Sequence, residues 1–307
     1  MREKVSVVGA GNVGATLAQR LAEIDLVDVA LVDVVEGLAE GKALDLLEAG
    51  PVVGYDSRVV GSTDYAITAQ SRVVVITSGL ARKPGMSRDD LVSANAKIVR
   101  EVVEQVLAQS PEAVLIIVTN PLDVMTELAL RVSGRPREKV IGMAGVLDTA
   151  RFRTFLAEEL RVSVHSVEAS VLGGHGDSMV PLRRATSVAG VPVERLLTPE
   201  RLEELVQRTR EGGGEIVRHL KTGSAFYAPS AAAAQMVEAI LRDRGQILPC
   251  AVRLQGEYGL DGVVMGVPVK LGAGGVEQVI EVELSPEERG ELERSAVAVR
   301  ETALVLN

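Results

Sequence analysis

The segment GGHGD, residues 173–177, is the first place where residue types and spacing suggest chemistry. Its glycines let the backbone pass close to a ligand, and they leave the imidazole of His175 accessible. Histidine titrates near neutral pH, so His175 is a candidate acid–base group. A single histidine is as often structural, so this interpretation requires a second group that orients and charges the ring.

A candidate partner for this histidine lies in VLDTARFRTFL, residues 146–156. Asp148 and Arg151 are three residues apart on a predicted helix, so they share one face. The carboxylate could fix the tautomer of His175 and favour its imidazolium. The arginine fork could hold a substrate carboxylate through two parallel hydrogen bonds. The local sequence by itself favours the alternative, an ordinary surface ion pair three residues apart on a helix.

A loop rich in basic residues follows the apolar run VVVITS, residues 73–78, and precedes a predicted helix. It has the sequence SGLARKPGMSRDDL and carries Arg82, Lys83 and Arg88. Glycine, proline and positive charge together are typical of a hinged lid that closes on a bound anion and excludes water. The alternative is a solvated basic loop.

The N-terminal motif GAGNVG, residues 9–14, follows an apolar run and begins a predicted helix. Gly9 allows a tight turn, Gly11 lets a pyrophosphate approach the backbone, and Gly14 allows close packing. The helix N-terminus then offers N–H groups to phosphate. Asp33 ends the next apolar run, where a carboxylate can accept hydrogen bonds from ribose and repel a 2′-phosphate. We therefore expect NAD rather than NADP.

Two predicted domains position these groups. Residues 1–144 alternate short Val- and Ile-rich runs with helices, which predicts an α/β fold with a doubly wound parallel sheet. VLIIVTN, residues 114–120, ends at Asn120, on the sheet edge where ligands bind and where its amide can reach a substrate oxygen. Residues 145–307 predict an α+β domain, with the site in the cleft between the two. The run GGG at 212–214 interrupts a helical pattern and predicts a kink.

The composition limits the possible partners. The 307 residues carry a formal charge of −9 with both signs interspersed, which does not predict nucleic-acid binding. No apolar run approaches the roughly 18 residues of a membrane helix. The single cysteine, Cys250, excludes an internal disulfide and a metal-binding cysteine cluster, so we expect no metal and a cytoplasmic location.

Taken in order, GAGNVG, VALVD, SGLARKPGMSR, TNPLDV, GVLDTARFR and GGHGD resemble the L-lactate and L-malate dehydrogenase family along nearly the whole chain. Within it, the segments EGKALDLLEA, GGGEIV, KTGSAFYAP and GVPVKLGAGGVE are most similar to the lactate-dehydrogenase-like malate dehydrogenases. The resemblance implies a Rossmann domain with a substrate domain, reversible NAD-dependent hydride transfer between L-malate and oxaloacetate, and a homo-oligomer, either a dimer or a tetramer.

The resemblance also implies a role for each matching position. His175 donates the proton in reduction with the help of Asp148, and Arg88 polarises the carbonyl from the lid. The substrate-binding set is Arg82, Arg88, Asn120 and Arg151, and the cofactor-binding set is Gly9, Ala10, Gly11, Asn12, Val13, Gly14, Asp33, Asn95, Val118 and Asn120.

Two alternatives remain. An L-lactate dehydrogenase shares these residues but generally has a neutral residue where this chain has Arg82, which argues against it. A non-catalytic NAD-binding protein would have no physical reason to keep His175, Asp148, Arg88 and Arg151 together.

Overall fold

The computed structural model describes residues 2–80 and 87–306, except for the side chain of Arg88. Its first half is a parallel sheet in which most strand residues are buried, as expected when helices cover both faces. This confirms the doubly wound sheet. In spatial order the strands are β3 (Val59–Ser62), β2 (Val27–Val32), β1 (Glu3–Val8), β4 (Val73–Ile76), β5 (Val114–Ile117) and β6 (Val140–Gly142).

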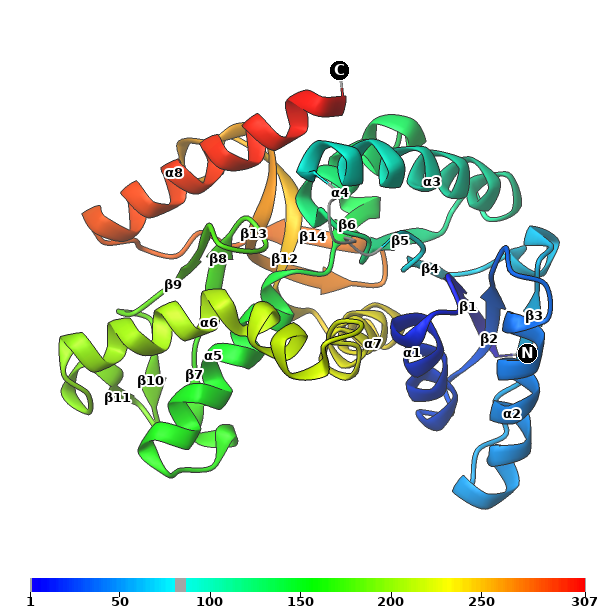
Figure 1. Cartoon of the computed structure of the whole chain (residues 1–307), viewed down its shortest axis with the longest axis horizontal. Coiled ribbons are helices and arrows are strands. Elements are labelled where there is room, and N and C mark those ends of the chain that lie inside the picture. Colours follow the sequence, from blue (N-terminus) through cyan, green and yellow to red (C-terminus); the bar gives the residue numbers. More distant parts are fainter. Residues whose placement is uncertain (1, 81–86, 307) are drawn as a thin grey trace.

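Helices cover the two faces of this sheet (Figure 1). On one face, α1 (Asn12–Glu23) packs against α2 (Leu38–Val53) and α7 (Tyr227–Leu241). On the other face, α3 (Arg88–Gln109) packs against α4 (Leu122–Ser133). The alanine-rich sequence of α7 lets it lie close to α1, so a helix from the second half of the chain completes the cover of the first half.

The sheet does not stop at the predicted domain boundary. β12 pairs with β6 through Ala251 and Gly142, and the strands beyond it are antiparallel. β12 and β13 are long and largely buried, so they need a neighbour on each side, which β6 supplies for β12. These strands are β12 (Gln246–Gln255), β13 (Asp261–Gly272), β14 (Gly275–Val279), β8 (Val171–Gly173) and β9 (Met179–Pro181).

Three further helices surround this antiparallel part: α5 (Gly145–Leu160), α6 (Pro199–Leu220) and α8 (Pro286–Ala303). α6 runs unbroken through 212–214, so the three glycines do not end the helix. Gly212 is buried where α6 packs on α5, which explains why the helical pattern lacks large side chains there.

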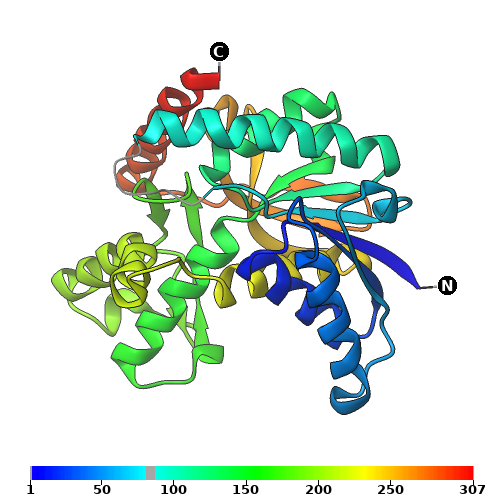
Figure 2. The same cartoon turned by 45° about the vertical axis from the view of Figure 1, so that its right-hand side comes forward.

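Figure 2 shows α5 and its neighbouring segments beside the sheet. Of the helices within the described ranges, none combines the length and hydropathy needed to cross a membrane.

Short elements complete the fold. A small sheet contains β7 (Val167–Glu168), β10 (Ser187–Val188) and β11 (Val191–Pro192). The 3-10 helices are η1 (Tyr65–Thr68), η2 (Arg137–Lys139), η3 (Val164–Ser166), η4 (Val193–Arg195), η5 (Glu257–Gly259) and η6 (Leu304–Leu306).

Candidate active site

His175 lies in the tight connection between β8 and β9, with 16% of its side chain exposed. Two of the flanking glycines have backbone angles that favour glycine: φ is +90° at Gly173 and +122° at Gly176. The glycines of the motif are therefore needed by the backbone that presents the imidazole. The loop holds the ring at the surface of a largely buried region.

The predicted partner of this histidine is in contact with it. Asp148, in the first turn of α5, is almost fully buried, and its Oδ2 lies 2.9 Å from His175 Nδ1. Burial lowers the pKa of His175, but the charge of Asp148 and its hydrogen bond outweigh this, so the pKa is raised overall. The imidazole is therefore suited to carry a proton at neutral pH.

Arg151 completes this cluster from the next turn of α5. One guanidinium nitrogen lies 3.1 Å from Asp148 Oδ1, so the same carboxylate holds both the histidine and the arginine. Arg151 Nε is buried and has no hydrogen-bond partner among the described residues. A Cβ at Gly212 would lie 3.1 Å from Arg151 Cδ, so the missing side chain of α6 gives the guanidinium its room. A largely buried cation with an unused donor is suited to an anionic ligand.

The glycine motif forms the turn between β1 and α1. A Cβ at Gly9 would lie 2.7 Å from the backbone nitrogen of Ser78, and one at Gly14 would lie 1.8 Å from the carbonyl oxygen of Gly9. At Gly11, by contrast, no described atom beyond Gly11 and its two chain neighbours lies within 4 Å of such a Cβ. In the described part of the chain, no side chain caps the N-terminus of α1. The exposed Gly11 and Asn12 thus border open space where a phosphate can approach free N–H groups.

Asp33 lies at the C-terminal end of β2, beside the glycine turn. Its Oδ2 accepts a hydrogen bond from the backbone N–H of Ala10 at 2.6 Å, and its Oδ1 accepts one from Val35 at 3.0 Å. The Lys42 ammonium donates to the carbonyl of Ala10 at 2.7 Å. The carboxylate predicted to select the ribose is therefore held in place by the same turn that would hold the pyrophosphate.

Three further predicted residues lie near the ends of β4 and β5. Asn95 is fully buried: its amide accepts from Leu80 N–H and donates to the carbonyls of Leu80 and Asn120. It therefore ties Leu80, just after β4, to the segment after β5. Val118 is buried, and the Asn120 side chain is exposed.

The basic residues of the predicted lid lie wholly or partly outside the described residues. Arg82 lies outside the described residues, and for Arg88 only the backbone, as the first residue of α3, is described. The helix start itself is well defined, because Ser87 and Asp90 form reciprocal hydrogen bonds.

Comparison with known proteins matches both halves of the chain. Residues 3–142 match the NAD binding domain of lactate/malate dehydrogenases, and residues 145–303 match their alpha/beta C-terminal domain. The chain belongs to the lactate/malate dehydrogenase family. It is an NAD-dependent oxidoreductase.

Relatives support this membership over the whole chain. The malate dehydrogenase of Thermomicrobium roseum is 60% identical over 301 residues, covering 98% of this chain and 97% of that protein. The solved malate dehydrogenase of Salinibacter ruber is 54% identical with a TM-score of 0.95, covering 99% and 97%. The lactate dehydrogenase of Cryptosporidium parvum, complexed with lactic acid and NAD, is 42% identical with a TM-score of 0.97, covering 100% and 98%.

The structure adds supporting residues to this dehydrogenase site that the sequence analysis did not identify. The Thr77 hydroxyl donates to the carbonyl of Gly9, and the Thr119 hydroxyl donates to that of Ser78. Asp123 accepts a hydrogen bond from the backbone of His175. The only signal in the sequence was that these residues follow buried strands, so each reaches the same sheet edge.

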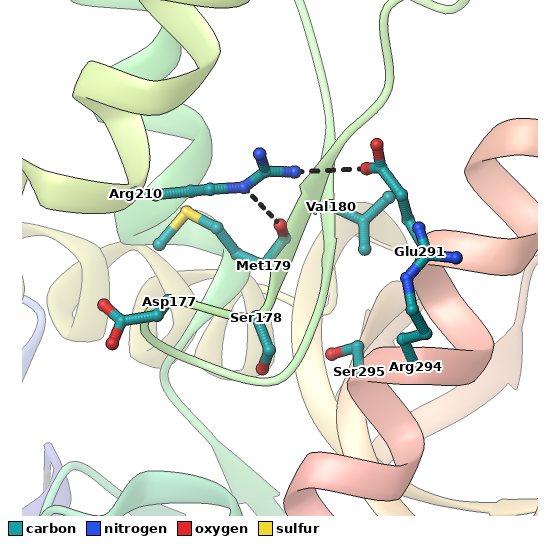
Figure 3. Close-up of a pocket in the computed structure, with 8 residues that line it drawn as sticks. All are labelled: Asp177, Ser178, Met179, Val180, Arg210, Glu291, Arg294 and Ser295. Carbon is teal, nitrogen blue, oxygen red and sulfur yellow. Dashed lines mark hydrogen bonds and ion pairs between the residues drawn. The ribbon is translucent and has the colours of Figure 1, made fainter.

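A separate polar cavity of about 270 Å³ lies beside the His175 loop, bordered by α6 and α8. Figure 3 shows Arg210 donating to the carbonyl of Met179 and to Glu291. Neither His175 nor Arg151 lines this cavity, so we do not assign it to the substrate. Across the described ranges, no group of three or more His, Cys, Asp or Glu residues could hold a metal.

Proposed function

We propose that this chain is a malate dehydrogenase that interconverts L-malate and oxaloacetate with NAD. The carrying observation is that the buried Asp148 holds the acid–base His175 with one oxygen and Arg151 with the other. Reduction of a 2-keto acid requires an acid for the keto oxygen and a cation for the carboxylate. Here one carboxylate, that of Asp148, positions both groups. The malate dehydrogenase relatives and Arg82 support the dicarboxylate over pyruvate.

Each protein group then has a defined task in reduction. Arg151 holds the carboxylate next to the keto group, and protonated His175 gives the proton of its Nε2 to the keto oxygen. Asp148 keeps Nδ1 protonated and so stabilises the ring in its tautomer. Arg88 of the lid stabilises the negative charge that develops on the keto oxygen. The Gly9 to Gly14 turn would hold NADH, and this cofactor would supply the hydride for the keto carbon.

The proposal is tested by measuring NADH oxidation with oxaloacetate and with pyruvate side by side. We expect kcat/KM for oxaloacetate to exceed that for pyruvate by at least about 100-fold. The reason is that pyruvate lacks the second carboxylate, so Arg82 would lose its hydration without gaining a partner, which is costly. A preference for pyruvate would favour lactate dehydrogenase. NADH binding without turnover of either acid would favour the non-catalytic alternative.

Replacing Asp33 with serine is expected to weaken the preference for NADH over NADPH by about tenfold or more. The carboxylate repels a 2′-phosphate, and Lys42, which already reaches the same turn, leaves a cation nearby. The ratio of kcat/KM values for the two cofactors measures this change. Asp28→Ser, at the other end of β2, is the matched control and should leave the ratio unchanged. A wild type that uses both cofactors equally would contradict the assigned role of Asp33.

We further propose that the chain works as a cytoplasmic homo-oligomer. Leu44, Leu47, Val52 and Val53 are exposed on α2, and several exposed apolar side chains on one element are typical of a subunit contact. The single buried thiol suits a reducing compartment. Light scattering after gel filtration measures the subunit number, and a monomer at assay concentrations would contradict the oligomer.

A further inference from the structure

Two buried side chains hold the backbone of the His175 loop from outside the loop. Asp123, at the start of α4, accepts the N–H of His175 with Oδ2 at 2.8 Å. Ser295 of α8 accepts the neighbouring N–H of Gly174, also at 2.8 Å. Asp123 is 6% exposed and Ser295 is 1% exposed. Consecutive amides of the loop are thus anchored to different helices.

The loop has little room to move between these anchors. A Cβ at Gly174 would lie 2.6 Å from Val299 Cγ2, 2.9 Å from Ser178 Oγ and 3.4 Å from Asp123 Oδ2. Because the backbone is packed this closely, the hydrogen bond to Asp123 fixes the position of the His175 backbone, from which the imidazole extends. The ring contact to Asp148 then determines its rotation.

Asp123 differs from Ser295 in its charge. Its second oxygen, Oδ1, is buried and has no hydrogen-bond partner within the described part of the chain. Among the described residues, the charged groups that act on His175 are Asp148 and Arg151 from α5 and Asp123 from α4. Burial raises the pKa of Asp123 to about 6, with His175 acting in the opposite direction and Asp148 adding to the rise. The histidine therefore lies between two carboxylates and one guanidinium.

We propose that Asp123 is a positioning residue for proton transfer, whose carboxylate anchors the backbone of His175 and electrostatically supports its protonated ring. This inference rests on the proposed function for its catalytic consequence, and on geometry for its effect on the histidine. Asp148 is hydrogen-bonded to Nδ1 of the ring, and Asp123 accepts a hydrogen bond from the backbone N–H of the same histidine. A serine such as Ser295 could provide the hydrogen bond alone, so the charge is what distinguishes the role of Asp123.

The test is Asp123→Asn, which keeps the shape and an acceptor oxygen but removes the charge. The chain has only three histidines, so nuclear magnetic resonance can follow the His175 ring directly, its signal being identified by its loss in His175→Asn. We expect the pKa of His175 to fall by about one unit in the protein without substrate. We also expect kcat for oxaloacetate at neutral pH to fall by about tenfold, with the pH profile shifted equally and the Kd for NADH unchanged.

Ser295→Ala is the matched control, because it removes the neighbouring loop hydrogen bond without changing any charge. It is expected to lower kcat while leaving the pKa of His175 unchanged. If Asp123→Asn fails to bind NADH, Asp123→Ser, which removes the charge with a smaller side chain, is measured in the same way. A pKa of His175 within about 0.2 units of the wild type in these variants would overturn the inference. A shifted pKa in an enzyme that does not reduce oxaloacetate would instead contradict the proposed function alone.

Discussion

His175→Asn is expected to lower kcat for oxaloacetate reduction by about 10²- to 10⁴-fold while leaving the Kd for NADH within about twofold. Asparagine is close to imidazole in polarity but cannot donate a proton as an acid at neutral pH. The cofactor contacts lie elsewhere, along the Gly9 to Gly14 turn and at Asp33. Steady-state kinetics and NADH fluorescence titration measure the two quantities separately.

The pH dependence gives a second check on this histidine. Because the pKa of His175 is raised, reduction should proceed below that pKa and be lost as the pH rises through it. Malate oxidation needs the neutral ring, so it should show the opposite limb. His165→Asn, at an exposed position in η3, is the control and should change neither kcat for oxaloacetate nor the Kd for NADH. Turnover of His175→Asn within a few fold of the wild type would exclude His175 as the proton donor.

Arg82→Gln is expected to reverse or abolish the preference for oxaloacetate over pyruvate. Oxaloacetate has a second carboxylate where pyruvate has a methyl group, and an arginine in the closed lid can pair with it. With pyruvate the guanidinium would be desolvated without a partner, which costs about 3 to 5 kcal/mol if it is fully buried. At about 1.4 kcal/mol per decade this corresponds to roughly 10²- to 10³-fold or more in kcat/KM.

The measurement is kcat/KM for both acids in the wild type and the variant. The value for oxaloacetate should fall sharply, the value for pyruvate should rise, and the Kd for NADH should stay the same. Lys83→Gln removes one positive charge from the same loop and is the matched control, because it separates a specific pairing from general attraction. An oxaloacetate-to-pyruvate ratio that changes by less than about twofold would show that Arg82 does not select the substrate.

Local patterns in the sequence predicted the parallel sheet and the residues of the central cluster. Runs without polar alternation indicate strands covered on both faces, and β4 and β5 are fully buried. The spacing of Asp148 and Arg151 predicted a shared helix face, and the two side chains are in contact. Spacing within one element can be derived from helix geometry alone, so this part needed no tertiary information.

Contacts between distant elements could not be derived in this way. The continuous sheet depends on the pairing of Gly142 with Ala251, more than 100 residues apart in sequence. The glycine at position 212 of α6 is explained by the packing against α5, because a Cβ there would lie 3.1 Å from Arg151 Cδ. The sequence pattern showed a missing side chain but did not show what occupied the space.

The sequence by itself determined which chemistry is available: a histidine between glycines, a carboxylate and an arginine on one helix face, and a glycine turn before a helix. Only the tertiary structure decided which groups support them. Asn95 turned out to hold Leu80 and Asn120, and Asp123 to hold the loop of His175. The physical reason is that a buried polar group takes whichever partner folding brings within hydrogen-bond distance, and that partner can lie anywhere in the chain.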